Sequence, residues 1–162
     1  DDAGHLLRLS RPVRVQDYTP TEGEWRNLLG LWVEKIRTRG QGRIHTEMNW
    51  AWAKLHTCEP AASLLLRDEK DGKPTETGSR QVLVKLRSIT RQDVPELSFA
   101  VDWVEDILDR GQCSTEAWRG TFTVGRVVPR NGVEALHNGT GVCITGYGVQ
   151  RALAYVGRQG CA

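Results

Sequence analysis

Residues 21–40 read TEGEWRNLLGLWVEKIRTRG, and this stretch decides the helical part of the fold. Thr21 and Glu24 have the spacing of a capping box, in which a hydroxyl and a carboxylate each accept a free backbone amide at a helix start. Apolar residues then recur at intervals of three and four, as on the buried face of an amphipathic helix. The stretch predicts a helix over about 22–39 that ends at Gly40, with a core face made of Trp25, Leu28, Leu29, Trp32, Val33 and Ile36.

A second amphipathic helix is predicted over about 94–110. Asp93 is a suitable N-cap, Pro95 is tolerated in the first turn, and Gly111 stands where a helix of this length would end. Helical spacing is seen again in its apolar residues, which are Leu97, Ala100, Val101, Val104, Ile107 and Leu108. The acidic side chains lie off this stripe and are expected to face solvent; they are Asp102, Glu105, Asp106 and Asp109.

Strands are predicted where apolar and polar residues alternate or β-branched residues gather between glycines. These segments are a short entry strand at 11–18 and longer runs at 80–89, 121–128 and 142–147. Residues 68–79 contain glycine and proline with almost no apolar side chain, which predicts a loop. The short apolar run 61–66 and the strand 80–89 flank this loop, so the two are expected to pair as a long hairpin.

Two segments are ambiguous. Residues 44–55 fit one face of a strand or one face of a helix, and the helix is favoured because it lets only one of Trp50 and Trp52 face the core. Residues 149–156 fit a last strand or a short helix equally well. Together the elements predict an α+β fold, in which an antiparallel sheet packs against two main amphipathic helices, 22–39 and 94–110.

Length and composition favour one folded unit. The chain has 162 residues, 39% of them apolar, and a formal net charge of +2, which predicts a single globular domain over 1–162. No apolar run approaches the length needed to span a bilayer, so we expect a soluble protein without membrane insertion. The chain starts at Asp1 without a methionine, which indicates a processed product or a fragment and permits secretion. The compartment is otherwise left open.

Four cysteines stand at positions 58, 113, 143 and 161. None has the close spacing of a zinc site, and His56 with Cys58 is only one pair, so no metal and no cofactor are predicted. Whether the thiols are reduced or paired stays open. Cys113, before a short helix that Ser114 would cap, and His137 are the candidates for the catalytic pair of a Cys-His hydrolase. A buried structural cysteine beside a surface histidine is the preferred interpretation of these two residues.

Arginine and tryptophan give the strongest hints of a binding surface. Seventeen of the 22 basic residues are arginine, whose planar guanidinium suits phosphate and aromatic partners. Tryptophans without an assigned core face are expected at an interface. The predicted binding residues are Trp50, Trp52, Trp118, Arg37, Arg39 and Arg43.

The sequence therefore favours a non-enzymatic module that acts by protein–protein interaction or assembly, including self-association. An arginine-rich nucleic-acid-binding protein is the alternative, which predicts binding that weakens steeply with salt. A Cys-His hydrolase is the third hypothesis. Neither the partner's identity nor the oligomeric state follows from the sequence.

Overall fold

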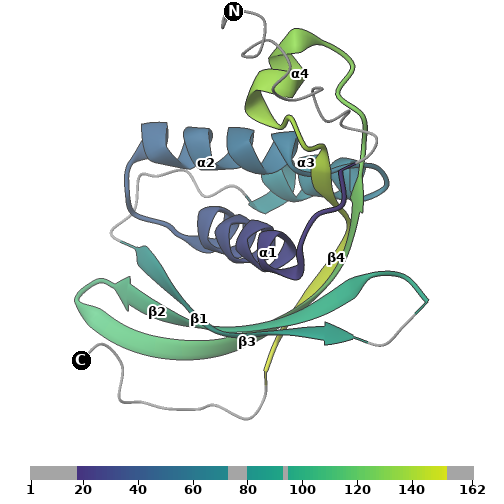
Figure 1. Ribbon diagram of the computed structural model, residues 1–162. Helices are drawn as coiled ribbons and strands as arrows, with labels where there is room; N and C mark the ends of the chain where they lie inside the picture. Colours follow the sequence, from purple (N-terminus) through teal and green to yellow (C-terminus); the bar gives the residue numbers. More distant parts are fainter. Residues whose placement is uncertain (1–17, 73–79, 93–94, 153–162) are drawn as a thin grey trace, which may run out of the picture.

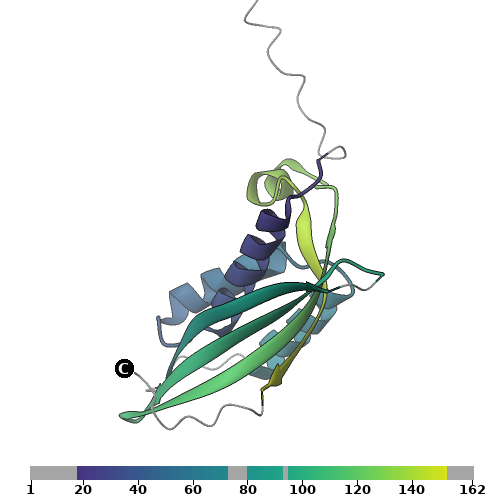
Figure 2. The same ribbon diagram turned by 60° about the horizontal axis from the view of Figure 1, so that its bottom comes forward.

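One antiparallel sheet carries a helical layer on one of its faces (Figures 1 and 2). The computed structural model describes residues 18–72, 80–92 and 95–152. The strands follow one another in the sheet in the order β1-β2-β3-β4, each antiparallel to the next. This confirms the predicted α+β class, whereas a single domain over 1–162 stays a prediction. The elements are α1 (Glu22–Arg37), α2 (Arg43–Leu55), α3 (Ala61–Gly72), β1 (Gln81–Gln92), β2 (Ser98–Asp109), β3 (Gln112–Arg126), α4 (Gly132–His137) and β4 (Val142–Arg151).

Helix α1 forms where the opening stretch predicts it. The Thr21 hydroxyl accepts a hydrogen bond from the backbone amide of Glu24 at 3.2 Å, as a capping threonine should. The predicted apolar stripe is buried against the sheet, and the Trp32 ring meets Phe122 of β3 edge to face, with 5.4 Å between ring centroids. The helix ends at Arg37, slightly before the predicted glycine.

Residues 43–55 form helix α2, so the preferred interpretation of this ambiguous segment is confirmed. Trp50 is buried in the core, while Trp52 points elsewhere and is only partly buried. The two tryptophans diverge because residues two apart lie on different sides of a helix. Their side chains therefore have different surroundings and cannot form one aromatic surface.

The second predicted helix is wrong, because residues 98–109 form strand β2 at the centre of the sheet. Phe99, Val101 and Trp103 alternate onto the core face, and Glu105 follows them there, 3% exposed. On the other face of the strand, Ala100 and Val104 are also apolar and buried. Apolar residues taken from both faces together therefore have the spacing of a helix. The acidic residues do not form one solvated face, since Glu105 is buried.

The glycine that was expected to end this helix instead makes a β-hairpin turn. Arg110 and Gly111 have φ angles of 51° and 76°, and Asp109 pairs directly with Gln112. Two consecutive residues at positive φ are typical of the tight turn that matches the twist of paired strands. The short helix expected after Cys113 is therefore wrong, since the residue lies in β3. The strand predicted at 121–128 is the last part of β3, which ends at Arg126.

Residues 61–72 form helix α3, which corrects both the predicted hairpin and the first part of the predicted loop. Only Ala61 and Leu65 of this helix are fully buried, so its apolar stripe is too narrow to show in the sequence. The charged end of α3 is fixed instead by an ion pair between Lys54 and Glu69, 2.5 Å apart. The predicted strand at 80–89 is confirmed as part of β1, and that at 142–147 as part of β4. Three parts of these predictions lie outside the described residues: positions 73–79 of the loop, positions 11–17 of the entry strand, and positions 153–156 of the second ambiguous segment. The start of that segment, 149–151, belongs to β4.

The outer face of the sheet, opposite the helices, carries cross-strand ion pairs beside apolar side chains such as Leu83, which is 54% exposed. Lys85 lies 2.6 Å from Asp106, and Arg119 lies 3.2 Å from Asp102. Hydrogen bonding from the Lys85 ammonium lowers the pKa of Asp106. Ion pairs of this kind are expected on the sheet face that is turned toward water.

Both outer strands of the sheet have part of their free edge occupied. Arg39 and Val82 exchange two backbone hydrogen bonds of 3.1 Å at one end of β1, and the Arg26 guanidinium donates to the carbonyl of Ile89 near the other end. On the opposite side, Thr57 pairs with Ile144 of β4 in a parallel bridge. These contacts satisfy backbone groups that an edge strand would otherwise expose.

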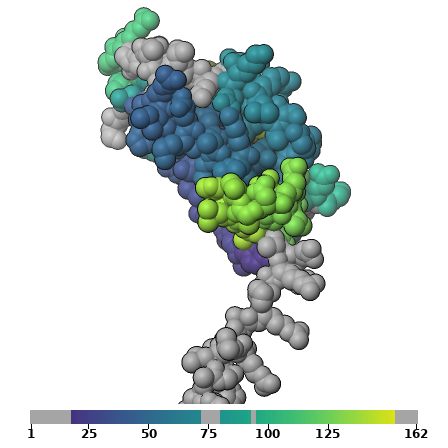
Figure 3. Space-filling view, turned by 90° about the horizontal axis from the view of Figure 1, so that it is seen from above, coloured from purple at the N-terminus to yellow at the C-terminus, as the bar shows by residue number. Residues whose placement is uncertain are grey.

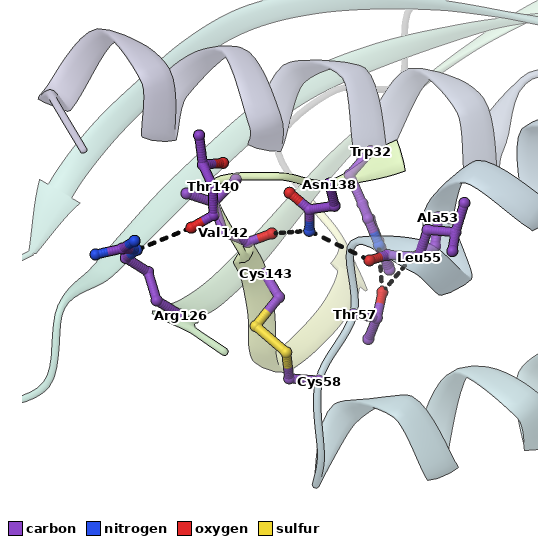
Figure 4. The surroundings of a disulfide bond; sticks show 10 residues. All are labelled: Trp32, Ala53, Leu55, Thr57, Cys58, Arg126, Asn138, Thr140, Val142 and Cys143. Atoms are coloured by element: carbon purple, nitrogen blue, oxygen red, sulfur yellow. Dashed lines mark hydrogen bonds between the residues drawn. A yellow bond between two sulfur atoms is a disulfide. The ribbon is translucent and has the colours of Figure 1, made fainter. Parts of the chain in front are cut away.

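A disulfide fastens the segment between α2 and α3 to the start of β4 (Figure 4). Cys58 is bonded to Cys143 across 85 residues, and the Cys58 amide donates to the Ile144 carbonyl at 2.8 Å. The side-chain amide of Asn138 donates to the Leu55 carbonyl at 3.3 Å and to the Val142 carbonyl at 2.9 Å, so α4, α2 and β4 meet at this corner. Cys58 and Cys143, whose redox state the sequence leaves open, are therefore oxidised and paired with each other.

The turn before β4 requires glycine at one position. Gly141 has a φ angle of 69°, and a Cβ atom built there would lie 1.8 Å from the carbonyl oxygen of Val127. Its own carbonyl accepts a 2.8 Å hydrogen bond from the Val127 amide. Both the left-handed backbone and the close approach exclude a side chain at this residue.

We expect the His56 imidazole to make the protein less stable in mild acid. Burial lowers the pKa of His56, and the Lys35 charge lowers it further, although the ring's Nδ1 donates to the Trp52 carbonyl at 2.8 Å. The unfolded chain therefore binds a proton more readily, and the free energy of unfolding should fall as the pH drops below about 6.5, by at most about 1.4 kcal/mol per pH unit for one proton. Urea unfolding of wild type and His56→Gln at pH 7.5 and 5.5 measures this loss.

His45→Gln is the matched control for this prediction, because His45 is exposed on α2, the helix that His56 follows as the C-cap residue. The His45 variant should keep the wild-type loss of stability between the two pH values, and the His56 variant should lose most of it. Equal pH dependence in wild type and His56→Gln would show that this imidazole does not control the effect.

Candidate protein-interaction site

A groove of about 420 Å³ opens between the helical layer and the sheet. Helices α1 and α3 form its sides, with contributions from α2, β2 and β4. Its lining residues are Trp32, Val33, Ile36, Arg37, Arg39, Trp50, Leu64, Leu65, Asp68, Asp71, Trp103, Tyr147, Gly148 and Val149. Four aromatic rings and several aliphatic side chains make most of this surface apolar, as is usual for a binding groove.

One side of the groove is held by a buried carboxylate. Glu105 accepts hydrogen bonds from Arg37, at 2.6 Å from Nε and 3.3 Å from Nη2, and from the indole nitrogen of Trp103 at 3.0 Å. The Arg37 guanidinium also lies 4.2 Å above the ring of Trp118. A two-point ion pair combined with a ring contact fixes the arginine in one orientation.

Next to it, Arg39 and Trp50 form the end of the groove nearest α2. Arg39 donates to the carbonyls of Ile36 and Thr38 at 2.5 and 2.9 Å and lies 5.9 Å from the centre of the Trp50 ring. The indole nitrogen of Trp50 is buried and has no hydrogen-bond partner among the described residues. An unpaired buried donor is costly, so this part of the groove holds a polar group that the described chain does not satisfy.

The opposite side is acidic and carries a tyrosine. The Tyr147 hydroxyl donates to Asp68 at 2.6 Å, and its ring lies 4.9 Å from that of Trp32. Burial raises the pKa of Tyr147 strongly, and the hydrogen bond to Asp68 adds to this effect, so the hydroxyl stays protonated as a donor. Asp71 continues the acidic side by one helical turn.

The groove therefore has an apolar base between a basic and an acidic side. Arg37 and Asp68 are engaged with Glu105 and Tyr147, which fixes both side chains at the sides of the groove. An aromatic base with fixed polar groups at its rim suits the recognition of another molecule's side chains.

The structure brings together three of the six predicted binding residues and separates the rest. Arg37, Arg39 and Trp50 line the groove, and Trp118 lies just outside it against Arg37. Trp52 instead stacks on His56, with 4.1 Å between ring centroids. Arg43 is exposed at the start of α2, where it pairs with Glu47 at 3.0 Å. Leu64, Asp68 and Tyr147 were not predicted, because nothing in the sequence shows that α3 and the end of β4 meet.

The proposed catalytic pair has no free thiol. Cys113 is disulfide-bonded, and His137 is the last residue of α4. Within the three described ranges, no group of three histidine, cysteine, aspartate or glutamate residues is placed to hold a metal ion. The pair His56 and Cys58 does not form a metal site either, since Cys58 is in a disulfide.

Several arginines in the described parts of the chain are engaged in local ion pairs. Arg26, Arg119 and Arg151 pair with Glu22, Asp102 and Glu116 on three separate elements. Ion pairs of this kind reduce the positive potential that a nucleic-acid backbone would require.

Comparison with known proteins places the chain in a family. The model of the VirB8 protein family matches residues 1–152. The chain belongs to the VirB8 family. Among curated proteins, none matches the chain.

Solved VirB8-like structures share this fold. The VirB8 protein of Agrobacterium tumefaciens has a TM-score of 0.67 at 12% identity and covers 85% of this chain and 99% of its own. A TrwG component of a type IV secretion system from Bartonella birtlesii has a TM-score of 0.70 at 16% identity, covering 86% of this chain and 98% of its own. The soluble domain of the TrwG type IV secretion machinery of Bartonella grahamii has a TM-score of 0.67 at 16% identity, with coverages of 85% and 99%.

VirB8 membership and these relatives support a role in protein interaction and assembly within a secretion system. They support neither of the other two hypotheses, so the arginine-rich nucleic-acid binder and the Cys-His hydrolase are not carried further. In the part of the chain that the structure describes, no helix is long and apolar enough to cross a membrane.

Proposed function

We propose that this chain is a non-enzymatic component of a type IV secretion machine and that it binds another protein of the machine through the groove between α1, α3 and the sheet. The observation that carries the proposal is the VirB8 family match, which spans residues 1–152. The apolar base of the groove and its oppositely charged sides support the groove as the contact site.

Three of the groove's residues have defined roles in this proposal. Trp50 forms part of the groove's lining, and its buried indole nitrogen has no hydrogen-bond partner among the described residues. Arg37 and Arg39 keep the basic side rigid, because each is already fixed by acceptors of this chain. A rigid rim reduces the ordering cost of binding. Trp52, Trp118 and Arg43 lie outside the groove, and we assign them no contact with this partner.

The disulfide supports an oxidising compartment for the folded domain. A bond between Cys58 and Cys143 persists in oxidising surroundings and is rare in the cytosol of mesophiles. We therefore place the folded domain outside the cytoplasm, in an oxidising space such as the bacterial periplasm.

Substitution of Leu64 by arginine should stop secretion without unfolding the chain. Leu64 lines the groove on α3 and is half-buried, so a guanidinium there can reach water but blocks the apolar base. In a strain that lacks the gene, we expect Leu64→Arg to restore secretion at least about tenfold less well than wild type, as for an interface hot spot. Leu66→Arg is the matched control, because Leu66 is exposed on the same helix outside the groove.

A photoreactive amino acid at each position identifies the partner directly. We expect position 64, and not position 66, to cross-link to another component of the secretion machine, identified by mass spectrometry. Unchanged secretion after deletion of the gene would refute the assigned machine, and full activity of Leu64→Arg would refute the groove as its contact site.

A further inference from the structure

Strand β3 is longer than its pairing with β4. The two strands pair from Trp118 to Arg126, and the Ala152 amide adds a 2.8 Å hydrogen bond to the Ala117 carbonyl. From there to the turn, β3 pairs with β2 alone, and the described parts of the chain supply no strand on its other side. Residues 112–116 therefore form an open edge of β3. Backbone groups point alternately to the two sides of a strand, so those of Thr115 face this edge as those of Ala117 face Ala152.

This open edge lies at an exposed end of the molecule. Figure 1 shows that β4 ends well short of the turn between β2 and β3. Residues 108–112 around that turn are exposed, and in Figure 3 this end of the hairpin, in green, lies at the margin of the molecule beside α2. An exposed strand edge is a template for pairing with other chains, and folded proteins usually cover it.

A cysteine in the open edge indicates what covers it. Cys113 lies in this edge and is disulfide-bonded. The chain has four cysteines, and Cys58 and Cys143 are bonded to each other. Within one chain, Cys161 is therefore the remaining cysteine that can supply the second sulfur. It belongs to the C-terminal segment, residues 153–162.

Strand β4 directs the C-terminal segment toward Cys113. The last described residue, Ala152, lies beside Ala117, and Cys113 is four residues farther along β3, or about 13 Å. Because β4 runs antiparallel to β3, the chain leaves β4 in the direction of the open edge. Nine residues lead from Ala152 to Cys161 and can span about 30 Å, so the distance is within reach.

The sequence of the C-terminal segment suits this path. Residues 153–162 read LAYVGRQGCA, in which Tyr155 and Val156 favour extended backbone. Continuing the register of Ala152 with Ala117 would bring Val156 opposite Cys113. The two glycines between Val156 and Cys161 then allow the chain to turn back toward the Cys113 sulfur.

We propose that a disulfide between Cys113 and Cys161 holds the C-terminal segment over the open edge of β3. Forming the bond removes two electrons and two protons from the two thiols, and a disulfide-bonded oxidoreductase of the oxidising compartment accepts them. A dithiol reverses the step and becomes a disulfide itself. Access to the edge therefore depends on the redox state of this bond.

The two disulfides of the chain should differ in how easily they are reduced. Cys143 is 1% exposed, whereas Cys113 is only partly buried. Exposed disulfides are the more labile ones, so a dithiol should open the bond of Cys113 first. The inference goes beyond the proposed function, because it concerns the sheet edge and not the groove.

A tryptic map without reductant tests the bond. In protein whose peptides 55–67 and 131–151 are linked through Cys58 and Cys143, we expect peptide 111–119 to be linked to peptide 159–162. Reduction should separate both pairs, and the intact mass before digestion should be that of one chain. Alkylated Cys113 or Cys161 in this sample, or a bond between two chains, would overturn the proposal.

Limited proteolysis tests whether the bond holds the segment in place. We expect chymotrypsin to cut after Tyr155 at least about tenfold faster in Cys161→Ser than in wild type, because a released segment opens more often. Cys113→Ser should behave in the same way. Gln159→Ser is the matched control, since it changes the same segment but keeps both sulfurs, and it should be cut like wild type.

A dithiol titration completes the test on the unmodified chain. Wild type should reach the cleavage rate of Cys161→Ser at a dithiol concentration that leaves Cys58 and Cys143 linked. Equal cleavage rates in oxidised wild type and Cys161→Ser would overturn the covering of the edge, even if the bond is present. Neither measurement involves secretion or Leu64, so failure here would leave the proposed function standing.

Discussion

Loss of the disulfide is expected to lower the free energy of unfolding by about 4 kcal/mol. The bond closes a loop with a sequence separation of 85 residues, and chain-entropy arguments give about 4.6 kcal/mol for a loop of this size. Cys143 is buried, and its neighbour Ile144 pairs with the segment that carries Cys58, so the cross-link holds α2, α3 and β4 together. Guanidinium unfolding of Cys58→Ala/Cys143→Ala against wild type measures the loss.

The single variants provide the control for this result. Cys58→Ala and Cys143→Ala should each lose nearly as much stability as the double variant, because the cross-link disappears with either sulfur. Losses that add up across the two sites would show that packing of the side chains, and not the cross-link, supplies the stability.

Replacement of Glu105 by alanine is expected to cost about 3 kcal/mol. The substitution leaves the Arg37 guanidinium and the Trp103 indole without their shared acceptor beneath the groove, and removing one partner of a buried ion pair typically costs about 3 to 5 kcal/mol. Arg37 is partly exposed and can turn to water, which places the expected loss at the lower end. Urea unfolding of the purified variant measures it.

Two further variants separate burial from charge. Asp102→Ala removes an ion pair with Arg119 on the outer face of the same strand and should cost less than about 1 kcal/mol, since that pair is exposed. Glu105→Gln keeps an acceptor for Trp103 and should lie between the two. Equal losses for Asp102→Ala and Glu105→Ala would contradict the structural role of the buried carboxylate.

Helix α1 could be predicted from sequence, and the central strand could not. Thr21 and the apolar spacing after it specify α1, because capping and a one-sided stripe agree. In β2, neighbouring strands cover Ala100 and Val104 on the outer face, so both faces look apolar and the period of two is masked. The aromatic and β-branched content of residues 99–107 was the signal for a strand that the prediction missed.

The residues that line the groove could likewise be predicted only in part. Arg37, Arg39 and Trp50 were predicted as binding residues because arginine and tryptophan favour interfaces. Tyr147 and Asp68 could not be found, since their contact depends on α3 packing against β4. Glu105 was assigned to a solvated helix face and becomes a structural acceptor only once its strand is known.

The occupied edges of the sheet restrict how copies of this protein can join. A strand from a neighbouring molecule would have to displace the backbone pairing of Arg39 at β1, or that of Thr57 at β4, before it could extend the sheet. The Arg26 guanidinium further blocks the far end of β1. Growth into ribbon-like stacks by edge-to-edge pairing of strands is thereby disfavoured.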